Sequence, residues 1–386
     1  MKPSMFDDFV NFARDLYSTK DFIPLHAPQF HGNEKEYVLD TINSTFVSSV
    51  GEFVDKFENS ISEYTGIKYA IATVNGTAAL HLALKLSGVE KNTEVITQSL
   101  SFIATCNVIR YCDAFPVLVD VERSTLGLSP ESLLEFLEEY SELRDDGYSW
   151  NKSTNRKIVA CVPMHTFGFP VELGKISQIC TRFNIELIED AAESMGSLYK
   201  EKHTGSIGKI SALSFNGNKI ITTGGGGMVL TNDEELAIKA KHISTTAKIS
   251  NTLAFEHDQI GYNYRLPNLN AALGLAQMES LPFYLESKRL IAKKYQEWGE
   301  SNDLFFFKEP VNSHSNYWLN VVITENKKNR DLMLATTNNS NVMTRPTWTP
   351  MHQLPMYKSC QKTNMKNTEW LFNRVVNVPS SPIFIN

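Results

Sequence analysis

Apolar and polar residues alternate along most of the chain in a pattern that predicts strands and helices in turn. From about residue 67 onward, short apolar runs such as YAIATV (69–74) and EVITQ (94–98) have the length and composition of buried strands. Each is followed by a stretch with helical periodicity, at 77–86 and at about 104–111. This βαβ pattern predicts a mostly parallel central sheet covered by helices.

The alternation continues well beyond these first two units. Its further members are PVLVDV (116–121), KIVACVPMH (157–165), a helix at 175–183, IELIEDAA (185–192), ALSFN (212–216) and GMVLT (227–231). The polar, turn-rich segment 145–157 predicts a surface excursion between two of them. Ligands of such sheets bind at the carboxyl ends of the strands, so we expect the functional residues there.

The pattern also divides the chain. We expect an N-terminal arm at 1–35, with an amphipathic helix within residues 1–22, and a large α/β domain at 36–280. A long helix from about Ser287 to Ser301 then leads into a smaller C-terminal α/β domain, 281–386, which contains YWLNVVITE and NVMTRPTW. A chain of 386 residues is long enough for two such domains.

Composition narrows the classes of function. The net charge of −6 argues against general affinity for nucleic acid or for an anionic membrane. The five cysteines form no CxxC pair, and no histidine cluster has metal-ligand spacing, so we expect reduced thiols and no metal. No apolar run approaches the roughly 20 residues of a membrane helix, and the N-terminus lacks the apolar stretch of a signal peptide. We expect a soluble, cytoplasmic protein.

Two charged residues follow predicted strands. Lys219 lies in SFNGNKIITTGGGGM, before four glycines whose backbone can approach a ligand closely. Taken alone, it would be interpreted as an exposed surface lysine. Asp190 ends a buried strand, where an unpaired charge is costly, and it needs either a cationic partner or the role of a helix N-cap.

Three further segments belong with this pair. In VNGTAALHLAL, Gly76 and Thr77 stand between a strand and a helix, where free N–H groups and the helix dipole favour an anion such as phosphate. Ser214, five residues before Lys219, could add a hydroxyl to the same anion. Phe102 could cover a planar ring, although an aromatic residue at a strand end is more often core.

These segments in their order resemble the sugar-nucleotide aminotransferases of the DegT/DnrJ/EryC1/StrS family, which have the fold type I, aspartate-aminotransferase-like architecture. The motifs are FVSSVGEFVDKFE, VNGTAALHLAL, IEDAAES, SFNGNKIITTGGGGM and GYNYRLPNLNAALGLAQ. The resemblance covers nearly the whole chain. It implies a pyridoxal 5′-phosphate (PLP) enzyme that passes through pyridoxamine 5′-phosphate while glutamate becomes 2-oxoglutarate.

The resemblance also implies a role for each matching residue. Lys219 would hold PLP as a Schiff base and move the proton, and Asp190 would pair with the pyridine nitrogen. Gly76 and Thr77 would bind the phosphate with help from Ser214, and Phe102 would stack on the ring. Asn263 in GYNYRL would reach the phosphate of a neighbouring subunit, which implies a homodimer with shared active sites. Glu193 stands where many members carry glutamine or histidine beside the cofactor's 3-hydroxyl.

A narrower likeness points to the substrate. The family's sugar dehydratases carry histidine in place of the lysine, so an intact Lys219 implies amination. PLHAPQFHGNEKEY, MHTFGFP, TTAKIS, SNYWLN, VMTRPTW and VVNVPSS resemble enzymes that aminate C4 of a UDP-4-keto-6-deoxy-N-acetylhexosamine on the path to legionaminic acid or bacillosamine-type sugars. The weaker candidates for contacts with the nucleotide sugar are His165, Tyr317, Arg345 and His352.

Several alternatives stay open. His165 could be a core histidine, and Arg345 could form a structural ion pair. The substrate could instead be a dTDP-linked 3- or 4-keto sugar. A nucleotide-binding oxidoreductase is disfavoured, because GGGG at 224–227 is not a GxGxxG that opens a helix after a first strand. A regulator that keeps the scaffold without the chemistry is disfavoured by the presence of both Lys219 and Asp190.

Overall fold

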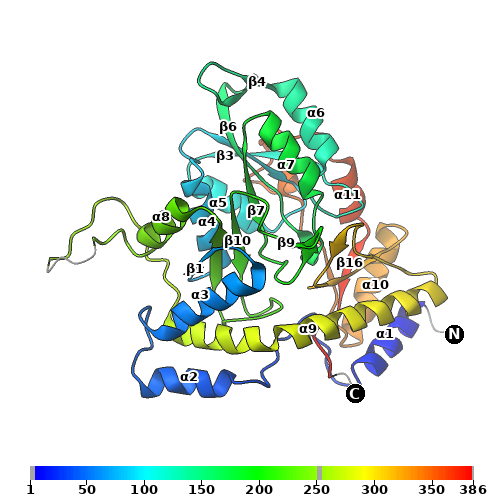
Figure 1. The fold of residues 1–386 in the computed structure, drawn as a ribbon. Coiled ribbons are helices and arrows are strands. Elements are labelled where there is room, and N and C mark those ends of the chain that lie inside the picture. The colour runs from blue at the N-terminus through cyan, green and yellow to red at the C-terminus, as the bar shows by residue number, and fades with distance from the viewer. Residues whose placement is uncertain (1–4, 250–253, 385–386) are drawn as a thin grey trace.

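The computed structural model describes residues 5–249 and 254–384 (Figure 1). The first four residues of the predicted N-terminal helix, and Ser250 at the end of TTAKIS, lie outside the described residues. Within the described residues, no helix has both the length and the apolar character needed to cross a membrane.

A large mixed sheet forms the centre of the molecule, with its main strands in the order β1-β11-β10-β7-β6-β2-β3. The five strands from β10 to β3 are parallel to one another, whereas β11 is antiparallel to both β1 and β10. The sheet is therefore mostly parallel, as predicted. The strands are β1 (Tyr69–Thr73), β2 (Glu94–Gln98), β3 (Phe115–Val119), β6 (Arg156–Val162), β7 (Glu186–Asp190), β10 (Ile210–Ser214) and β11 (Gly227–Thr231).

Helices cover both faces of this sheet, and the strand residues alternate between them. Ile71 and Val229 pack in one buried apolar cluster, with residues of α4 (Gly76–Leu86), α5 (Ile103–Tyr111) and α8 (Glu234–Ser244). Their neighbours Ala70, Met228 and Leu230 pack in a second cluster, with α3 (Glu52–Thr65) and α9 (Asn268–Ser301). This alternation follows from the two-residue period of a strand. Two more helices, α6 (Pro130–Tyr140) and α7 (Leu173–Arg182), bury apolar residues in a third cluster.

The polar 145–157 segment is an ordered extension of the sheet. β4 (Ser141–Leu143) and β5 (Ser149–Asn151) form an antiparallel hairpin, and β5 pairs with β6. The Trp150 indole donates to the Asp146 carboxylate at 3.1 Å, which holds the turn in place. The predicted surface excursion therefore contains a strand that its polar composition concealed.

The long helix α9 starts much earlier than predicted. It runs from Asn268 to Ser301, with Pro282 inside it. The predicted start near Ser287 is wrong because the buried face continues through Leu281 and Tyr284, on both sides of the proline. The expected domain boundary at residue 280 therefore falls within a helix.

The C-terminal residues build a second, smaller sheet beside α9 (Figure 1). Its strand order is β12-β14-β16-β15, and every pairing is antiparallel. The N-terminal helix α1 packs against α10, so the two ends of the chain share this part of the molecule. The elements are α1 (Met5–Leu16), α10 (Lys327–Asn339), α11 (Lys366–Phe372), β12 (Phe305–Phe306), β14 (Asn320–Ile323), β15 (Arg345–Pro346) and β16 (Val375–Val378).

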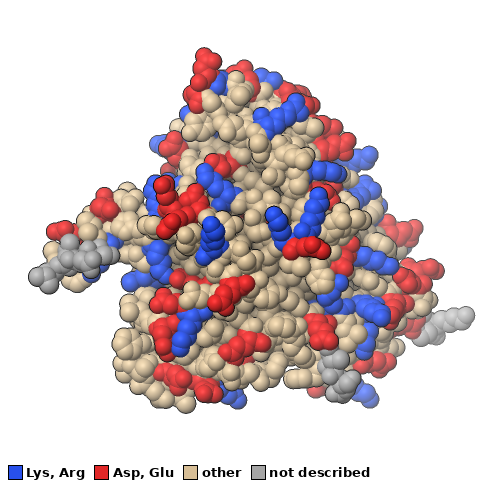
Figure 2. Space-filling model, in the orientation of Figure 1, with Lys and Arg blue, Asp and Glu red and all other residues tan. Residues whose placement is uncertain are grey.

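The remaining elements are short or peripheral. A three-stranded sheet has the order β13-β8-β9, and α2 packs on α9. Acidic and basic side chains are interspersed over the face shown in Figure 2. The elements are α2 (Glu34–Asn43), β8 (Leu198–Tyr199), β9 (Lys202–His203), β13 (Ser313–His314) and the short 3-10 turns η1 (Thr166–Gly168) and η2 (Met351–Gln353).

Candidate active site

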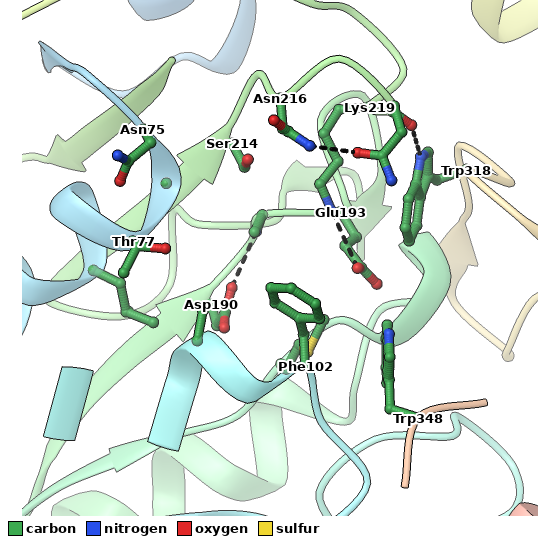
Figure 3. A pocket seen from close by; sticks show the side chains of 16 residues that line it. Asn75, Thr77, Phe102, Asp190, Glu193, Ser214, Asn216, Lys219, Trp318 and Trp348 are labelled. Carbon is green, nitrogen blue, oxygen red and sulfur yellow. Dashed lines mark hydrogen bonds and ion pairs between the residues drawn. The ribbon is translucent and has the colours of Figure 1, made fainter. Parts of the chain in front are cut away.

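A cavity of about 410 Å³ opens at the carboxyl ends of β7 and β10 (Figure 3). The start of α4 lies on one side of it and two tryptophans lie on the other. The register of the sheet places the α4 turn close to the end of β10. Gly227 pairs both with Thr73, just before the α4 turn, and with Ser214 at the end of β10. The lining residues are Asn75, Gly76, Thr77, Leu80, Phe102, Ala104, Met164, Asp190, Ala192, Glu193, Ser214, Asn216, Asn218, Lys219, Trp318 and Trp348.

Lys219 points into this cavity from the loop between β10 and β11. Its Nζ lies 3.1 Å from Oε1 of Glu193 and 4.0 Å from the ring centroid of Trp318. Only 13% of the side chain is exposed, so the interpretation as an ordinary surface lysine is wrong. The loop is held by the Trp318 indole, which donates to the carbonyl of Asn218 at 2.7 Å.

Asp190 is the last residue of β7 and is buried beneath the cavity. Its Oδ2 accepts from the Thr105 hydroxyl at 2.7 Å, and its Oδ1 accepts from the N–H of Ala192 at 3.2 Å. No helix begins at Asp190 in the described chain, so the alternative of a helix N-cap is wrong. Burial raises the pKa of the carboxyl, as expected for a group that lacks a full positive counter-charge.

Glu193 is the second buried carboxyl of the cavity. One oxygen accepts from the N–H of Phe167 at 2.9 Å, and the other faces Lys219. Burial raises the pKa of Glu193 to about 6, and the negative charge of Asp190 acts in the same direction. Glu193 can therefore change its protonation state near neutral pH.

The turn before α4 leaves two backbone donors free. Asn75 accepts from the N–H of Ala78 at 2.8 Å through its side chain and from Ala79 at 3.1 Å through its carbonyl. The Gly76 and Thr77 N–H groups donate to no acceptor among the described residues, and they lie at the positive end of the helix. A phosphate would satisfy both.

Two glycines make this turn possible. A Cβ on Gly76 would lie 2.7 Å from the Ser214 Cβ, and a Cβ on Gly227 would lie 2.5 Å from the Asn75 carbonyl carbon. The strand that follows the glycine run therefore passes directly beneath the α4 turn. This close approach is the physical reason for glycine at both positions.

Two tryptophans on one side of the cavity, Trp318 and Trp348, form a tryptophan wall that the sequence analysis missed. Trp348 packs on Phe167 at 4.8 Å between ring centroids, and Phe102 approaches Trp348 edge-on at 6.1 Å. Phe102 is 47% exposed, so it is available to a ligand and is not core. Tryptophans at two distant positions near predicted strands were the only sequence signal for this wall.

The four weaker substrate candidates do not line the cavity. His165 is fully buried, with Nε2 3.1 Å from Glu189, and it is the core histidine of the alternative interpretation. Tyr317 is buried against Phe169, whereas its neighbour Trp318 lines the cavity. The sequence analysis thus selected the residue next to the one that faces the site.

The other two candidates lie in the C-terminal part. Arg345 is exposed in β15, where it donates to Asn338 and to the Thr344 carbonyl, and it forms no ion pair among the described residues. His352 bonds to Ser99 at 2.7 Å, and burial lowers its pKa. Asn263 is exposed and forms an isolated bridge with Thr245, outside the cavity of its own chain.

The sequence and the fold were compared with known proteins. The model of the DegT/DnrJ/EryC1/StrS aminotransferase family matches residues 28–385. The chain is 36% identical over 369 residues to GDP-perosamine synthase of Escherichia coli O157:H7, covering 95% of both chains. It is 34% identical to the putative pyridoxal phosphate-dependent aminotransferase EpsN of Bacillus subtilis, covering 93% of this chain and 90% of that protein.

Solved structures agree in fold. A DegT/DnrJ/EryC1/StrS aminotransferase from Brucella abortus superposes with a TM-score of 0.83 at 25% identity, covering 92% of this chain and 91% of that one. Helicobacter pylori PseC, an aminotransferase of pseudoaminic acid biosynthesis, also superposes with a TM-score of 0.83, at 24% identity and with 93% of both chains covered. The chain therefore belongs to the DegT/DnrJ/EryC1/StrS aminotransferase family and is a PLP-dependent transaminase.

Proposed function

We propose that this enzyme uses Lys219 to aminate C4 of a nucleotide-linked 4-keto-6-deoxy sugar, with glutamate as the amino donor. The observation that carries the proposal is the placement of the Lys219 amine in a cavity that also holds a buried Asp190 and two free N–H groups. Membership of the family establishes a PLP-dependent aminotransferase with a nucleotide-sugar substrate. The particular sugar and the residue roles are our inference.

The residues present fit PLP. The free N–H groups of Gly76 and Thr77 suit its phosphate. Ser214 lies beside Gly76, so its hydroxyl can donate to the same phosphate. Asp190 is a buried carboxyl that needs a cation, which a protonated pyridine nitrogen supplies. Phe102 offers an exposed aromatic face beside them.

When bound, PLP supplies an electron sink for the carbanion left after removal of the α-proton. Lys219 is the group that would move this proton, because its amine is a base that lines the cavity beside Glu193. Glu193 takes up or returns a proton at Nζ of Lys219 through their 3.1 Å contact. Asp190 would pair with the pyridine nitrogen of the bound cofactor through its buried carboxylate.

The nucleotide is the least determined part of the substrate. The narrower sequence likeness favours a UDP-linked 2-acetamido-4-keto-2,6-dideoxyhexose. Relatives at 36%, 32% and 34% identity are GDP-perosamine synthases of Escherichia coli O157:H7, Vibrio cholerae and Caulobacter vibrioides, which favours guanosine diphosphate. We place the GDP-linked keto sugar first and keep the UDP-linked sugar as the second candidate.

Product analysis tests the proposal. Purified enzyme is incubated with glutamate and with GDP-, UDP- and dTDP-linked 3- and 4-keto sugars, and the products are identified by mass spectrometry. We expect one 4-keto-6-deoxy sugar to gain an amine. Glutamate should also bleach the absorbance band of the cofactor.

Matched lysine variants locate the chemistry. Lys219→Ala should abolish turnover, whereas Lys209→Ala, at an exposed lysine paired with Glu186, should leave it unchanged. Turnover by Lys219→Ala at the wild-type rate would refute the assignment. If no sugar of the panel is aminated, the proposed substrate class is refuted. The reaction with glutamate is measured separately and would still test the role of Lys219.

A further inference from the structure

Trp318 belongs to the segment before β14, in the C-terminal part of the chain, yet it contacts the loop that carries Lys219 (Figure 3). Its indole N–H donates to the carbonyl of Asn218 at 2.7 Å, and its ring centroid lies 4.0 Å from Nζ of Lys219. Both contacts are attractive, the second because an amine carrying positive charge is drawn to the face of an indole. One side chain therefore holds both the backbone of the loop and the end of the lysine.

The loop has few other attachments. Residues 216–219 form a turn, in which the Lys219 N–H donates to the Asn216 carbonyl at 2.9 Å and the Asn216 amide donates to the Asn218 side chain at 3.0 Å. Both asparagines are exposed. Among the described residues, Trp318 and Glu193 make the only hydrogen bonds that join 216–219 to another part of the chain. The position of the Lys219 amine therefore depends on these two side chains.

Trp318 and Glu193 are themselves joined through Asn316. The Asn316 side chain is fully buried, its amide donates to the Glu193 carbonyl at 3.0 Å, and its oxygen accepts from the backbone N–H of Trp318 at 2.8 Å. The amine of Lys288 adds a bond to the Trp318 carbonyl at 3.0 Å. The two groups that meet the Lys219 amine thus belong to one hydrogen-bonded unit in the interior, to which the exposed loop is attached.

A direct contact with substrate is the other role open to Trp318, because it lines the cavity. Only 5% of the residue is exposed, however, and the Lys219 amine lies over its ring. Phe102, at 47% exposed, offers far more aromatic surface to a ligand. Burial of Trp318 therefore favours a role through Lys219 over a role in binding the sugar.

We propose that Trp318 is a positioning residue for Lys219, whose loop is fixed by the indole N–H and whose amine is fixed beside Glu193 by the ring face. This inference rests on the proposed function, because it needs Lys219 as the residue that reacts with PLP. Lys219 has to be in place both when glutamate reacts and when the keto sugar reacts. Loss of the Trp318 contacts should therefore slow both half-reactions by the same factor.

Trp318→Phe tests the hydrogen bond, because phenylalanine keeps an aromatic face and lacks the indole N–H. In the PLP-free protein, amide hydrogen exchange in the peptide that contains residues 216–222 should become faster. The cofactor absorbance band should form roughly fivefold more slowly when PLP is added, and both half-reactions should slow by the same factor, the effect of one lost hydrogen bond. The sugar concentration that gives half the maximal rate in single turnover should stay constant. Trp318→Leu, which also removes the ring face, should lose roughly a further threefold.

Trp298→Phe is the matched control. It makes the same substitution in α9, where the Trp298 ring packs on Phe12 at 5.2 Å and does not line the cavity. It should leave all of these rates unchanged. Trp318→Phe should lose no more stability in urea than this control, since the carbonyl of the exposed Asn218 can accept from water instead.

Three outcomes would overturn the proposal. The first is wild-type hydrogen exchange and a wild-type rate of PLP binding in Trp318→Phe. The second is a change confined to the sugar concentration for half-maximal rate, which would make Trp318 a substrate contact. The third is unfolding of both Trp318 variants while Trp298→Phe stays folded.

Borohydride reduction followed by peptide mapping separates this inference from the proposed function. If PLP is attached to a different lysine of the wild-type enzyme, the role of Lys219 fails. If PLP is attached to Lys219 at equal rates in the wild type and in Trp318→Phe, only the role of Trp318 fails.

Discussion

Gly76→Ala tests whether the turn before α4 is locked against the sheet. The new methyl group would lie 2.7 Å from the Ser214 Cβ, 3.0 Å from its Oγ and 3.3 Å from the Leu213 carbonyl oxygen. These atoms cannot move aside freely, because Ser214 is paired in register with Gly227. Overpacking of this kind costs about 1–3 kcal/mol. Replacing glycine by alanine also stabilises the folded state by about 0.4–1 kcal/mol, because it lowers the conformational entropy of the unfolded chain. The overpacking therefore prevails, and we expect a net loss of about 1–2 kcal/mol.

The measurement is urea unfolding of the PLP-free protein at a fixed protein concentration, together with titration of PLP. Gly76→Ala should unfold at lower urea and bind PLP more weakly, since the two free N–H groups move with the turn. Gly217→Ala is the control, because its methyl group would meet nothing closer than the Gly224 carbonyl oxygen at 3.9 Å. Adding Ser214→Gly to Gly76→Ala should restore most of the lost stability. Wild-type stability and PLP affinity in Gly76→Ala would refute the close-packing argument.

Three further predictions follow from the buried titratable groups. The raised pKa of Glu193 means that the folded state holds its proton more tightly than the unfolded state. The free energy of unfolding of the wild type should therefore fall by about 2 kcal/mol relative to that of Glu193→Gln as the pH rises from about 4.5 through 6. The same pH dependence of this free energy in both proteins would contradict the prediction. His165→Ala leaves the N–H of Val171 without its partner and removes one of the two donors to a Glu189 oxygen, which keeps the Gly205 N–H. It should therefore cost about 1–3 kcal/mol in denaturant unfolding while KM for the sugar nucleotide stays constant. Burial raises the pKa of Cys106 and Cys112, so Ellman's reagent should label these thiols in the native protein far more slowly than after unfolding.

Local pattern was sufficient to predict the sheet and the residues next to its strands. Asp190 and Ser214 stand at the carboxyl ends of β7 and β10, which are neighbouring parallel strands, so their placement at one edge follows from the βαβ pattern. The Gly76 turn follows β1, which is separated from β10 by the antiparallel β11, and this order of strands came from the structure. The polar hairpin around β5 could not be predicted in the same way, because its pairing with β6 depends on tertiary contact.

The tryptophan wall and the start of α9 needed the structure. Trp318 and Tyr317 are adjacent in sequence in the segment that precedes β14, and only the folded backbone of this segment decides which of the two faces the cavity. Tyr317 has a φ of +45°, a local geometry that no periodicity rule anticipates. α9 starts well before the predicted Ser287, because buried residues on both sides of Pro282 keep the helix continuous through the proline.

The continuity of α9 has a consequence for motion. At 1.5 Å per residue, its 34 residues form a rod of about 50 Å that crosses the expected division between the two domains. Near its start, the Asn270 amide donates to the Thr223 carbonyl at 2.7 Å, just before the glycine run, and further along Lys288 holds the carbonyl of Trp318. The glycine run and the segment that carries Trp318 are thus both hydrogen-bonded to the same helix, α9. We therefore expect no hinge at residue 280, and hydrogen exchange should be slow along the middle of α9 whether or not ligand is bound.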